Sequence, residues 1–209
     1  MSSAVAILDY DAGNLTSVAC AVRHLGREPL VTRDPRKIQA AEWVIFPGVG
    51  AAGTAMESLQ RLQLDQAIRD AFESGKAILG ICVGCQVVLE RSEENQGTDC
   101  LGLLKGTVKR FRFAQGIVRK IPHMGWNEVK FQNHHPVFQG LTEGSQFYFV
   151  HSYYPVPDDT ALVQGTAVYG GVQFAAAMAH RNLAIVQFHP EKSGPPGLRI
   201  LENFLSWRP

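Results

Sequence analysis

The sequence has little net charge, few cysteines and no long hydrophobic run. Its 20 Lys and Arg stand against 19 Asp and Glu, so the formal net charge is +1 and no global basic field exists to hold nucleic acid. The four cysteines lack the spacing of a disulfide framework or a zinc ribbon. No apolar stretch approaches the roughly 20 residues that a membrane helix needs, and no signal peptide is expected. These absences favour a cytoplasmic globular protein.

What the sequence does contain is enough apolar material for a sizeable core. Hydrophobic residues make up 45% of the chain and charged residues only 19%, which is unlike a disordered tail. No internal repeat, low-complexity tract or linker interrupts it. We therefore expect residues 1–209 to form a single domain.

The first half alternates short apolar runs with helical periodicity. The patterns predict strands at Ala4–Leu8, Pro29–Thr32, Trp43–Phe46 and Lys76–Ile81, and helices at Asn14–Leu25, Met56–Phe72 and Gly84–Arg91. Short buried strands that alternate with helices indicate an α/β protein, in which a mostly parallel central sheet carries helices on both faces.

The second half changes character, with shorter apolar runs separated by Gly, Pro and Asn. The patterns predict strands at Thr107–Phe113, Glu128–Phe131, Gln146–Val150, Ala161–Val168, Val172–Ala177 and Ala184–Phe188, and a closing helix at Leu198–Trp207 after a break at 194–197. We interpret the strands before Ala184 as antiparallel additions and hairpins on the same sheet.

The strongest local motif is Gly80–Gly84 (GICVG), between an apolar strand and a helix. It has the form of a nucleophile elbow with cysteine at the nucleophile position. A sharp strand-to-helix turn would push Cys82 out above the sheet edge, and the glycines would let strand and helix approach. The helix N-terminus would favour the thiolate. The alternative is a buried cysteine between glycines that serve packing only.

A thiolate nucleophile also needs a base and a group to orient that base. Of the seven histidines, His151 and His189 stand at strand ends, whereas His123 is assigned to a turn or loop. In an extended segment alternate residues face the same side, so Glu191 is expected to point with His189 and to fix its tautomer. Pro190 would hold the extended form. The alternative is a structural histidine with a surface glutamate.

Pro47–Gly50 (PGVG) follows another predicted parallel strand, at the sheet edge where α/β sites form. Its glycines expose the backbone N–H groups of Val49 and Gly50, which could face a developing oxyanion. The N–H of Val83, just after the nucleophile, would be a further donor. The alternative is an ordinary loop that needs glycine for its turn geometry.

Together these segments resemble a known family. Gly80–Gln86 (GICVGCQ) and Gln187–Glu191 (QFHPE) resemble the class I, or triad, glutamine amidotransferases. Pro122–Asn127 (PHMGWN) and Tyr148–Tyr153 (YFVHSY), with Pro47–Gly50, are similar to the glutaminase subunits of imidazole glycerol phosphate synthases, and the similarity runs from end to end. It implies the family's three-layer α/β fold, with a mostly parallel sheet and antiparallel additions.

The resemblance implies a reaction and a partner. Cys82 would attack the side-chain amide of glutamine, His189 would activate the thiol and then protonate the departing ammonia, and Glu191 would orient His189. The ammonia would pass to a (β/α)8-barrel cyclase subunit in a heterodimer. That subunit would make imidazole glycerol phosphate and the aminoimidazole carboxamide ribotide in histidine biosynthesis. The resemblance implies no metal or other cofactor.

The resemblance also assigns substrate contacts. Gln86 and Glu94 would hold the α-amino and carboxylate ends of glutamine, with help from the main chain of Ser152 and Tyr153, and Gly48 would also face the substrate. A dehydrated zwitterion does need both of its charges satisfied. The alternative for Glu94 is a solvated loop charge.

The family pattern further points to Asn14, Trp126, Tyr148 and Lys192 on the barrel-facing surface, although Trp126 and Tyr148 could equally be core residues. In this family the PGVG peptide sits turned away until the partner and its ligand reorient it. Because glycines flank Val49, its peptide can turn at low cost, and its N–H is expected to be a switchable donor.

The sequence departs from the family at Cys85, where methionine is usual; we interpret this cysteine as an apolar packing residue or a partner for an oxidised Cys82. Three other functions stay open: a glutaminase that serves another synthase, such as anthranilate or pyridoxal phosphate synthase, a stand-alone Cys hydrolase, and a non-catalytic binding module. PHMGWN argues against the first, and the joint presence of Cys, His and Glu argues against the last.

Overall fold

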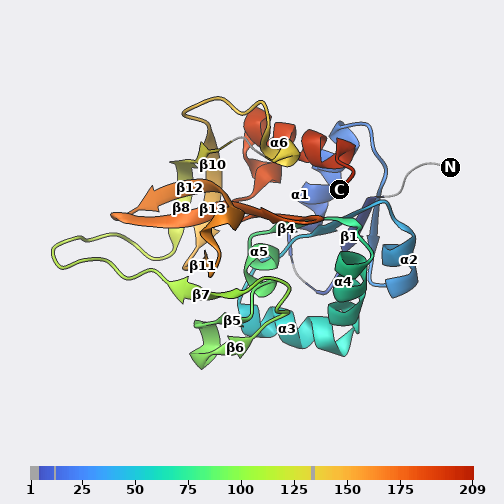
Figure 1. Cartoon of the computed structure of the whole chain (residues 1–209), viewed down its shortest axis with the longest axis horizontal. Helices are drawn as coiled ribbons and strands as arrows, with labels where there is room; N and C mark the ends of the chain where they lie inside the picture. The colour runs from blue at the N-terminus through green and yellow to red at the C-terminus, as the bar shows by residue number, and fades with distance from the viewer. Residues whose placement is uncertain (1–4, 12, 133–134) are drawn as a thin grey trace.

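The computed structural model describes residues 5–11, 13–132 and 135–209 (Figure 1). The strands are β1 (Val5–Leu8), β2 (Pro29–Thr32), β3 (Trp43–Phe46), β4 (Ala77–Ile81), β5 (Arg91–Ser92), β6 (Thr98–Asp99), β7 (Gly106–Arg110), β8 (His123–Glu128), β9 (Lys130–Phe131), β10 (Gln146–His151), β11 (Tyr153–Pro157), β12 (Val163–Tyr169), β13 (Val172–His180) and β14 (Leu183–Val186). The helices are α1 (Leu15–His24), α2 (Pro35–Ala40), α3 (Ala52–Arg61), α4 (Leu64–Glu73), α5 (Val83–Val87) and α6 (Gly194–Ser206).

An eight-stranded sheet in the order β2-β1-β3-β4-β14-β13-β12-β9 forms the centre of the fold. The strands from β2 to β14 pair in parallel, and β13, β12 and β9 continue the sheet antiparallel. All residues of β1, β3, β4 and β14 are buried, which fits strands covered on both faces.

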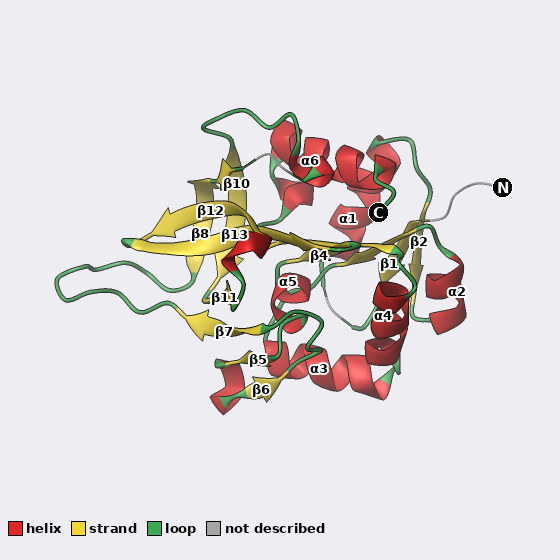
Figure 2. Ribbon diagram, in the orientation of Figure 1, coloured by secondary structure: helices red, strands yellow, loops and turns green. Residues whose placement is uncertain are grey.

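Helices cover both faces of this sheet, giving the three-layer α/β arrangement predicted from the sequence (Figure 2). In this view α1 and α6 lie above the sheet, whereas α3, α4 and α5 lie below it. The buried side chains of these layers form one hydrophobic core cluster. Among the described residues, none of the helices has the length and apolar character needed to cross a membrane.

The prediction that all antiparallel strands extend the main sheet is wrong. β8 and β10 form a separate two-stranded sheet, and β11-β7-β5-β6 form a four-stranded one. β8 was missed because the predicted strand began only at Glu128, where β8 ends. β8 comprises the PHMGWN motif without its proline, followed by Glu128. Its polar residues and glycine hide a strand in which exposed positions alternate with less exposed ones, of which only His123 is buried.

Two predicted helices of the first half are too long. The stretch from Met56 to Phe72 is two helices, because Gln63 takes a left-handed conformation with φ of 57° and turns the chain between α3 and α4. The helix predicted to run to Arg91 ends at Val87, and Arg91 opens β5.

Two further helix predictions need correction. α6 begins at Gly194, so the predicted break at 194–197 is its first turn; prolines fit there because first-turn N–H groups have no partner inside the helix. α2 was not predicted at all. It spans only six residues, and Asp34 caps it by accepting a hydrogen bond from the Arg36 N–H.

Candidate active site

Three neighbouring parallel strands end at one edge of the sheet and bring the predicted site together. β3 is followed by Pro47–Gly50, β4 by Cys82, and β14 by the segment that carries His189. These segments open onto a cavity of about 180 Å³. The cavity is lined by Val49, Gly50, Cys82, Val83, Gln86, Glu94, Pro122, Val150, His151, Ser152, Tyr153 and His189. Sites at the carboxyl ends of parallel strands are the rule in open α/β sheets.

Cys82 lies on a strained turn between β4 and α5, with φ of 55° and ψ of −106°. Glycine is required on both sides of it. A Cβ on Gly80 would lie 2.7 Å from a methyl carbon of Ile185, and a Cβ on Gly84 would lie 2.0 Å from the Phe46 carbonyl oxygen. The strand-to-helix elbow predicted from the motif is therefore present, and its glycines do permit the close packing expected of them.

The sulfur of Cys82 is almost fully buried in polar surroundings. Gln187 Nε2 lies 3.9 Å from Sγ, and the carbonyl oxygen of Val150, on β10 of the two-stranded sheet, also lies 3.9 Å from Sγ. The amide donates toward the sulfur. Sequence reasoning missed Gln187, although it belongs to the QFHPE motif.

His189 and Glu191 meet as predicted, but for a different reason. Pro190–Lys192 forms a 3-10 turn rather than an extended segment, and this turn brings the two side chains together. His189 Nδ1 lies 2.8 Å from Glu191 Oε1, and neither side chain has any exposed surface. Asn14 Nδ2 also donates to Glu191, so the loop before α1 fixes the carboxylate.

The other ring nitrogen of His189 is free to act in the cavity. Nε2 is buried and has no hydrogen-bond partner in the described part of the chain. Burial opposes a charge on this ring, but the neighbouring Cys82 sulfur and the Glu191 carboxylate outweigh it and raise the pKa of His189 well above its usual value. The arrangement therefore favours an imidazolium next to the sulfur.

In the Pro47–Gly50 loop a carbonyl oxygen, rather than an N–H, meets the elbow. Val83 N–H donates to the Gly48 oxygen at 3.4 Å, so this expected oxyanion donor is already engaged. Gly48 is tightly enclosed, since a Cβ there would lie 2.1 Å from the Tyr10 hydroxyl oxygen. Gly50 has φ of 97° and open space around it.

Of the predicted glutamine contacts, Gln86, Glu94, Ser152 and Tyr153 line the same cavity, whereas Gly48 is not among its lining residues. The buried Gln86 amide donates to the Tyr153 carbonyl oxygen and to Gln187 Oε1, both at 2.9 Å. Glu94 accepts a hydrogen bond from the Ala52 N–H at 2.7 Å, so it tethers the start of α3 and is not a free loop charge. Ser152 and Tyr153 reach the cavity between β10 and β11.

Three of the four predicted interface residues touch one another. The Trp126 and Tyr148 rings lie 6.1 Å apart edge to face, and Lys192 Nζ lies 5.9 Å from the Tyr148 ring centroid. Trp126 is 56% exposed, which excludes the alternative that it belongs to the core. Asn14 bonds to Glu191, the residue before Lys192.

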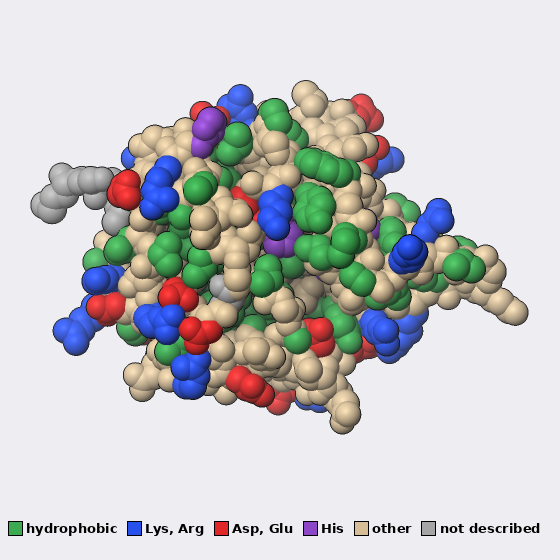
Figure 3. Space-filling model, turned by 180° about the vertical axis from the view of Figure 1, so that it is seen from behind, with side chains coloured by type: hydrophobic (Ala, Val, Ile, Leu, Met, Phe, Trp, Pro, Cys, Tyr) green, Lys and Arg blue, Asp and Glu red, His purple; other side chains and the backbone are tan. Residues whose placement is uncertain are grey.

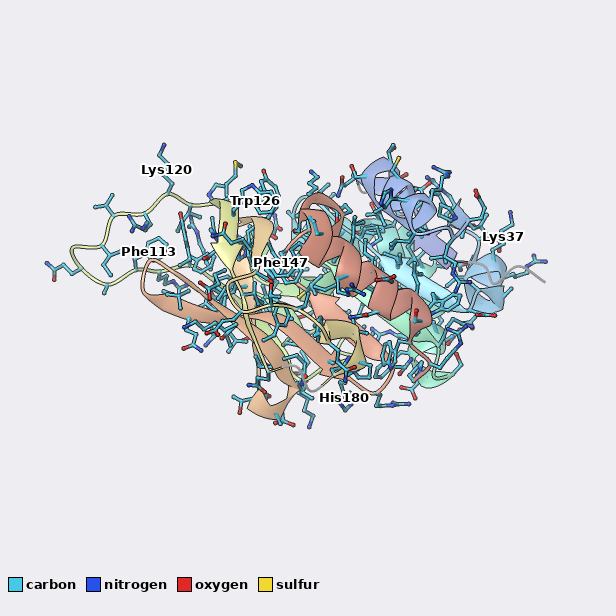
Figure 4. The ribbon with its side chains drawn as sticks, turned by 90° about the horizontal axis from the view of Figure 1, so that it is seen from above. Lys37, Phe113, Lys120, Trp126, Phe147 and His180 are labelled. Atoms are coloured by element: carbon cyan, nitrogen blue, oxygen red, sulfur yellow. The ribbon has the colours of Figure 1, made fainter. Side chains whose placement is uncertain are left out.

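The exposed hydrophobic residues near Trp126 form an apolar region. They are Ile117, Met124, Trp126 and Val168, which line one shallow surface cavity. Figure 3 shows hydrophobic side chains gathered on the back face, next to the protruding loop between β7 and β8. Figure 4 shows that Lys120 of this loop and Trp126 lie at the same edge of the molecule.

Cys85 is buried and its pKa is raised by that burial and by Cys82, as befits a packing residue. Within the described ranges, no three His, Cys, Asp or Glu side chains cluster so that they could hold a metal ion.

Comparisons with known proteins agree with this geometry. The family model for "Glutamine amidotransferase class-I" matches residues 6–207. The chain is 50% identical over 214 residues to the "Imidazole glycerol phosphate synthase subunit HisH" of Methylococcus capsulatus, covering 99% of this chain and 98% of that protein. It is 46% identical over 207 residues to the protein of the same name from Nitrosococcus oceani, covering 98% of each.

Solved structures share the fold at lower identity. The "Structure of PurLQS from Thermotoga maritima" superposes with a TM-score of 0.74 at 22% identity, covering 99% of each chain. A "Crystal structure of glutamine amidotransferase" superposes with a TM-score of 0.72 at 20% identity, covering 97% of each chain.

Proposed function

This chain belongs to the class I glutamine amidotransferases, and on that premise we propose that it is the glutaminase subunit of an imidazole glycerol phosphate synthase. It hydrolyses glutamine to glutamate and ammonia, and the ammonia is used in histidine biosynthesis. Its residues 1–209 act as one amidotransferase domain, in the cytoplasm. The observation that supports this most directly is the meeting of Cys82 with the buried His189–Glu191 pair at one cavity.

The first half of the reaction forms a thioester. The Cys82 thiolate attacks the amide carbon of glutamine, and the C=O π electrons move to the oxygen to give an oxyanion. His189 Nε2–H protonates the amide nitrogen, the C–N bond breaks, and ammonia leaves. Glu191 accepts the Nδ1–H bond, which keeps Nε2 directed at the sulfur and the leaving group.

The second half releases glutamate. His189, now neutral, takes a proton from water, and the oxygen attacks the thioester carbon. The C–S bond then breaks and Cys82 leaves as the thiolate, while the ring keeps the proton that it took from water, which restores the starting thiolate and imidazolium. The new carboxyl group of glutamate gives its proton to solvent. The proton transfers and the covalent steps of the cycle need only these side chains and water.

The oxyanion needs hydrogen-bond donors, and one of the expected donors is bonded elsewhere in this conformation. The Val83 N–H bonds to the Gly48 oxygen, so the Gly48–Val49 peptide has to turn before Val83 N–H and Val49 N–H can both face an oxyanion. Gly50, with its positive φ and open surroundings, makes room for that turn. Low activity of the isolated subunit follows from this geometry.

Substrate recognition uses the walls of the same cavity. Gln86 and Glu94 bind the α-amino and carboxylate ends of glutamine, and the main chain of Ser152 and Tyr153 and of Gly48 completes the contacts. Gln86 and Glu94 are each held by protein hydrogen bonds, which preorganises them.

The partner is a (β/α)8-barrel cyclase that binds this subunit as a heterodimer and receives ammonia without its release to solvent. Asn14, Trp126, Tyr148 and Lys192 face that partner. The exposed Trp126 supports the assignment, because aromatic residues are favoured at interface hot spots.

The test is ammonia release from glutamine by the subunit alone, with the cyclase, and with the cyclase and its ligand. We expect low release alone and a rise of about 10² or more with partner and ligand, the loss expected when an oxyanion donor is missing. Equal rates in all three mixtures contradict the switchable donor. No release in any of them contradicts the glutaminase function itself.

A further inference from the structure

Two histidines outside the proposed triad bond to each other in the interior. His123 opens β8 and His151 closes β10, directly opposite one another in the antiparallel pair. His123 Nδ1 lies 2.9 Å from His151 Nε2. Their exposed fractions are only 3% and 5%, and His151 lines the active-site cavity.

The neighbours of the pair fix where each proton lies. His151 Nδ1 is 2.8 Å from the Tyr153 carbonyl oxygen, which can only accept, so Nδ1 of His151 carries the hydrogen. In a neutral ring Nε2 of His151 then has a lone pair and accepts from His123 Nδ1–H. Nε2 of His123 in turn accepts from Asn127 Nδ2, at 3.4 Å.

Both rings lie in surroundings that keep them neutral. Burial lowers the pKa of His123 to about 4. Burial, against the opposing hydrogen bond to Tyr153, lowers the pKa of His151 to about 3. His123 also stacks on Tyr169 at 4.0 Å and on Phe149 at 4.8 Å between ring centroids, so the ring has little freedom to rotate. One hydrogen per imidazole satisfies every contact described.

The Tyr153 carbonyl oxygen, at the end of this series of hydrogen bonds, accepts from two side chains, His151 and Gln86. Gln86 Nε2 donates to it at 2.9 Å, and Gln86 also donates to Gln187, whose own amide reaches the Cys82 sulfur. An unbroken set of polar contacts therefore runs from His123 on β8 to the nucleophile. The peptide at its middle belongs to the main chain proposed to receive glutamine.

We propose that His123 and His151 are positioning residues for glutamine binding: the Tyr153 carbonyl oxygen and the His123 Nδ1–H together hold His151 in its Nδ1–H tautomer, and His151 thereby fixes the Tyr153 carbonyl. The donor that His123 supplies satisfies His151 Nε2, which keeps the ring directed at that carbonyl. The role in glutamine binding rests on the function proposed above, whereas the tautomer follows from the hydrogen-bond geometry alone.

The tautomers can be observed directly in the intact chain. Nitrogen chemical shifts of the histidine rings, measured by NMR with ¹⁵N-labelled protein at neutral pH, distinguish Nδ1–H from Nε2–H. We expect both His123 and His151 to be Nδ1–H in the wild type. His123→Phe keeps a ring between Tyr169 and Phe149 but removes the donor to His151 Nε2, so the Nε2 resonance should shift to that of a nitrogen without a hydrogen bond, while Nδ1 keeps the hydrogen that it donates to the Tyr153 carbonyl oxygen. An Nε2–H signal for His151 in the wild type overturns the proposal.

Kinetics of the complex with the cyclase test the consequence. His123→Phe should raise KM for glutamine about three- to ten-fold, the effect of one lost hydrogen bond, while kcat stays within about two-fold. His123→Asn places an amide donor near the position of Nδ1 and should restore KM, which a purely structural loss would not allow.

A matched control is His180→Phe. His180 pairs with Leu183 at the opposite end of β14 from the site, so this change should leave KM unaltered. A wild-type KM in His123→Phe overturns the positioning role. If wild-type complex releases no ammonia, the proposed glutaminase function fails instead, and the NMR result still decides the tautomer.

Discussion

The two halves of the chain build their parts of the site in different ways. The first half contributes the nucleophile and the oxyanion loop from parallel strands that are buried on both faces. The second half contributes the base and the substrate-facing main chain. The base follows β14, whereas the substrate-facing main chain lies between antiparallel strands outside the main sheet, with exposed side chains on many of them.

The difference shows how rigidity is distributed in this site. Cys82 is held by backbone geometry, between glycines that no other residue can replace without a clash. His189 and Glu191 are held by side-chain hydrogen bonds on a short 3-10 turn. Substitutions should therefore act through packing in the first half and through charge and hydrogen bonding in the second.

The largest expected effect comes from removing the sulfur. Cys82→Ala should lower glutamine hydrolysis by about 10⁴-fold or more, because no thioester can form. Far-UV circular dichroism and partner binding should be unchanged. Cys85→Ala is the control, since Cys85 is equally buried three residues later and is assigned to packing. Comparable activity of Cys82→Ala and wild type would show that the first half of the chain does not supply the nucleophile.

An intermediate effect is expected on stability, and it should be larger for a glycine in the first half than for one in the second. Gly84→Ala places a Cβ 2.0 Å from the Phe46 carbonyl oxygen. We expect it to lower the free energy of unfolding by about 3 kcal/mol, as for overpacking of a tight core. Gly125→Ala on β8 meets no atom within 4 Å and strains only its φ of 121°. It should cost about 1 kcal/mol. Urea denaturation measures both free energies of unfolding. Equal losses in the two variants would contradict the proposed difference in packing between the two halves.

The smallest effect concerns the charge on the second half's base. The pKa of His189 is raised from 6.5 to about 10 by Cys82 and Glu191 against the opposing effect of burial. A raised pKa contributes stability that is full below pH 6.5 and is lost as pH rises through about 10. Glu191→Gln removes part of that contribution. Its deficit in melting temperature should therefore be largest near pH 6.5 and shrink toward pH 10. A deficit that grows with pH would contradict the imidazolium.

Much of the first half could be predicted from local pattern alone. β2 and β3 match their predicted bounds residue for residue, because continuous apolar runs between turn residues have few other interpretations. The turn at Gln63 was not predictable, since nothing in its side chain requires a left-handed conformation. The elbow at Cys82 was predictable, because its glycines are needed to avoid steric clashes.

Less of the second half could be predicted from the sequence. Only His123 of β8 is buried, and this residue is polar: it bonds to His151 on another strand and to Asn127 of its own strand. The bond from Asn14 to Glu191 joins residues at opposite ends of the sequence. The direction of the Gly48 carbonyl is likewise a property of the folded loop. Such contacts are set by tertiary structure, which no local pattern encodes.

The position of β14 has a consequence for synthesis on the ribosome. This strand fills the gap between β4 and β13, yet it is the last of the strands to be made. Gln187 follows Cys82 by 105 residues, so at ordinary elongation speeds the sulfur waits about 5 to 20 seconds for the segment that carries its base. During that interval β4 has an open edge, which exposes the nascent chain to mispairing. A nascent chain that ends before His189 lacks the base, and it therefore cannot hydrolyse glutamine.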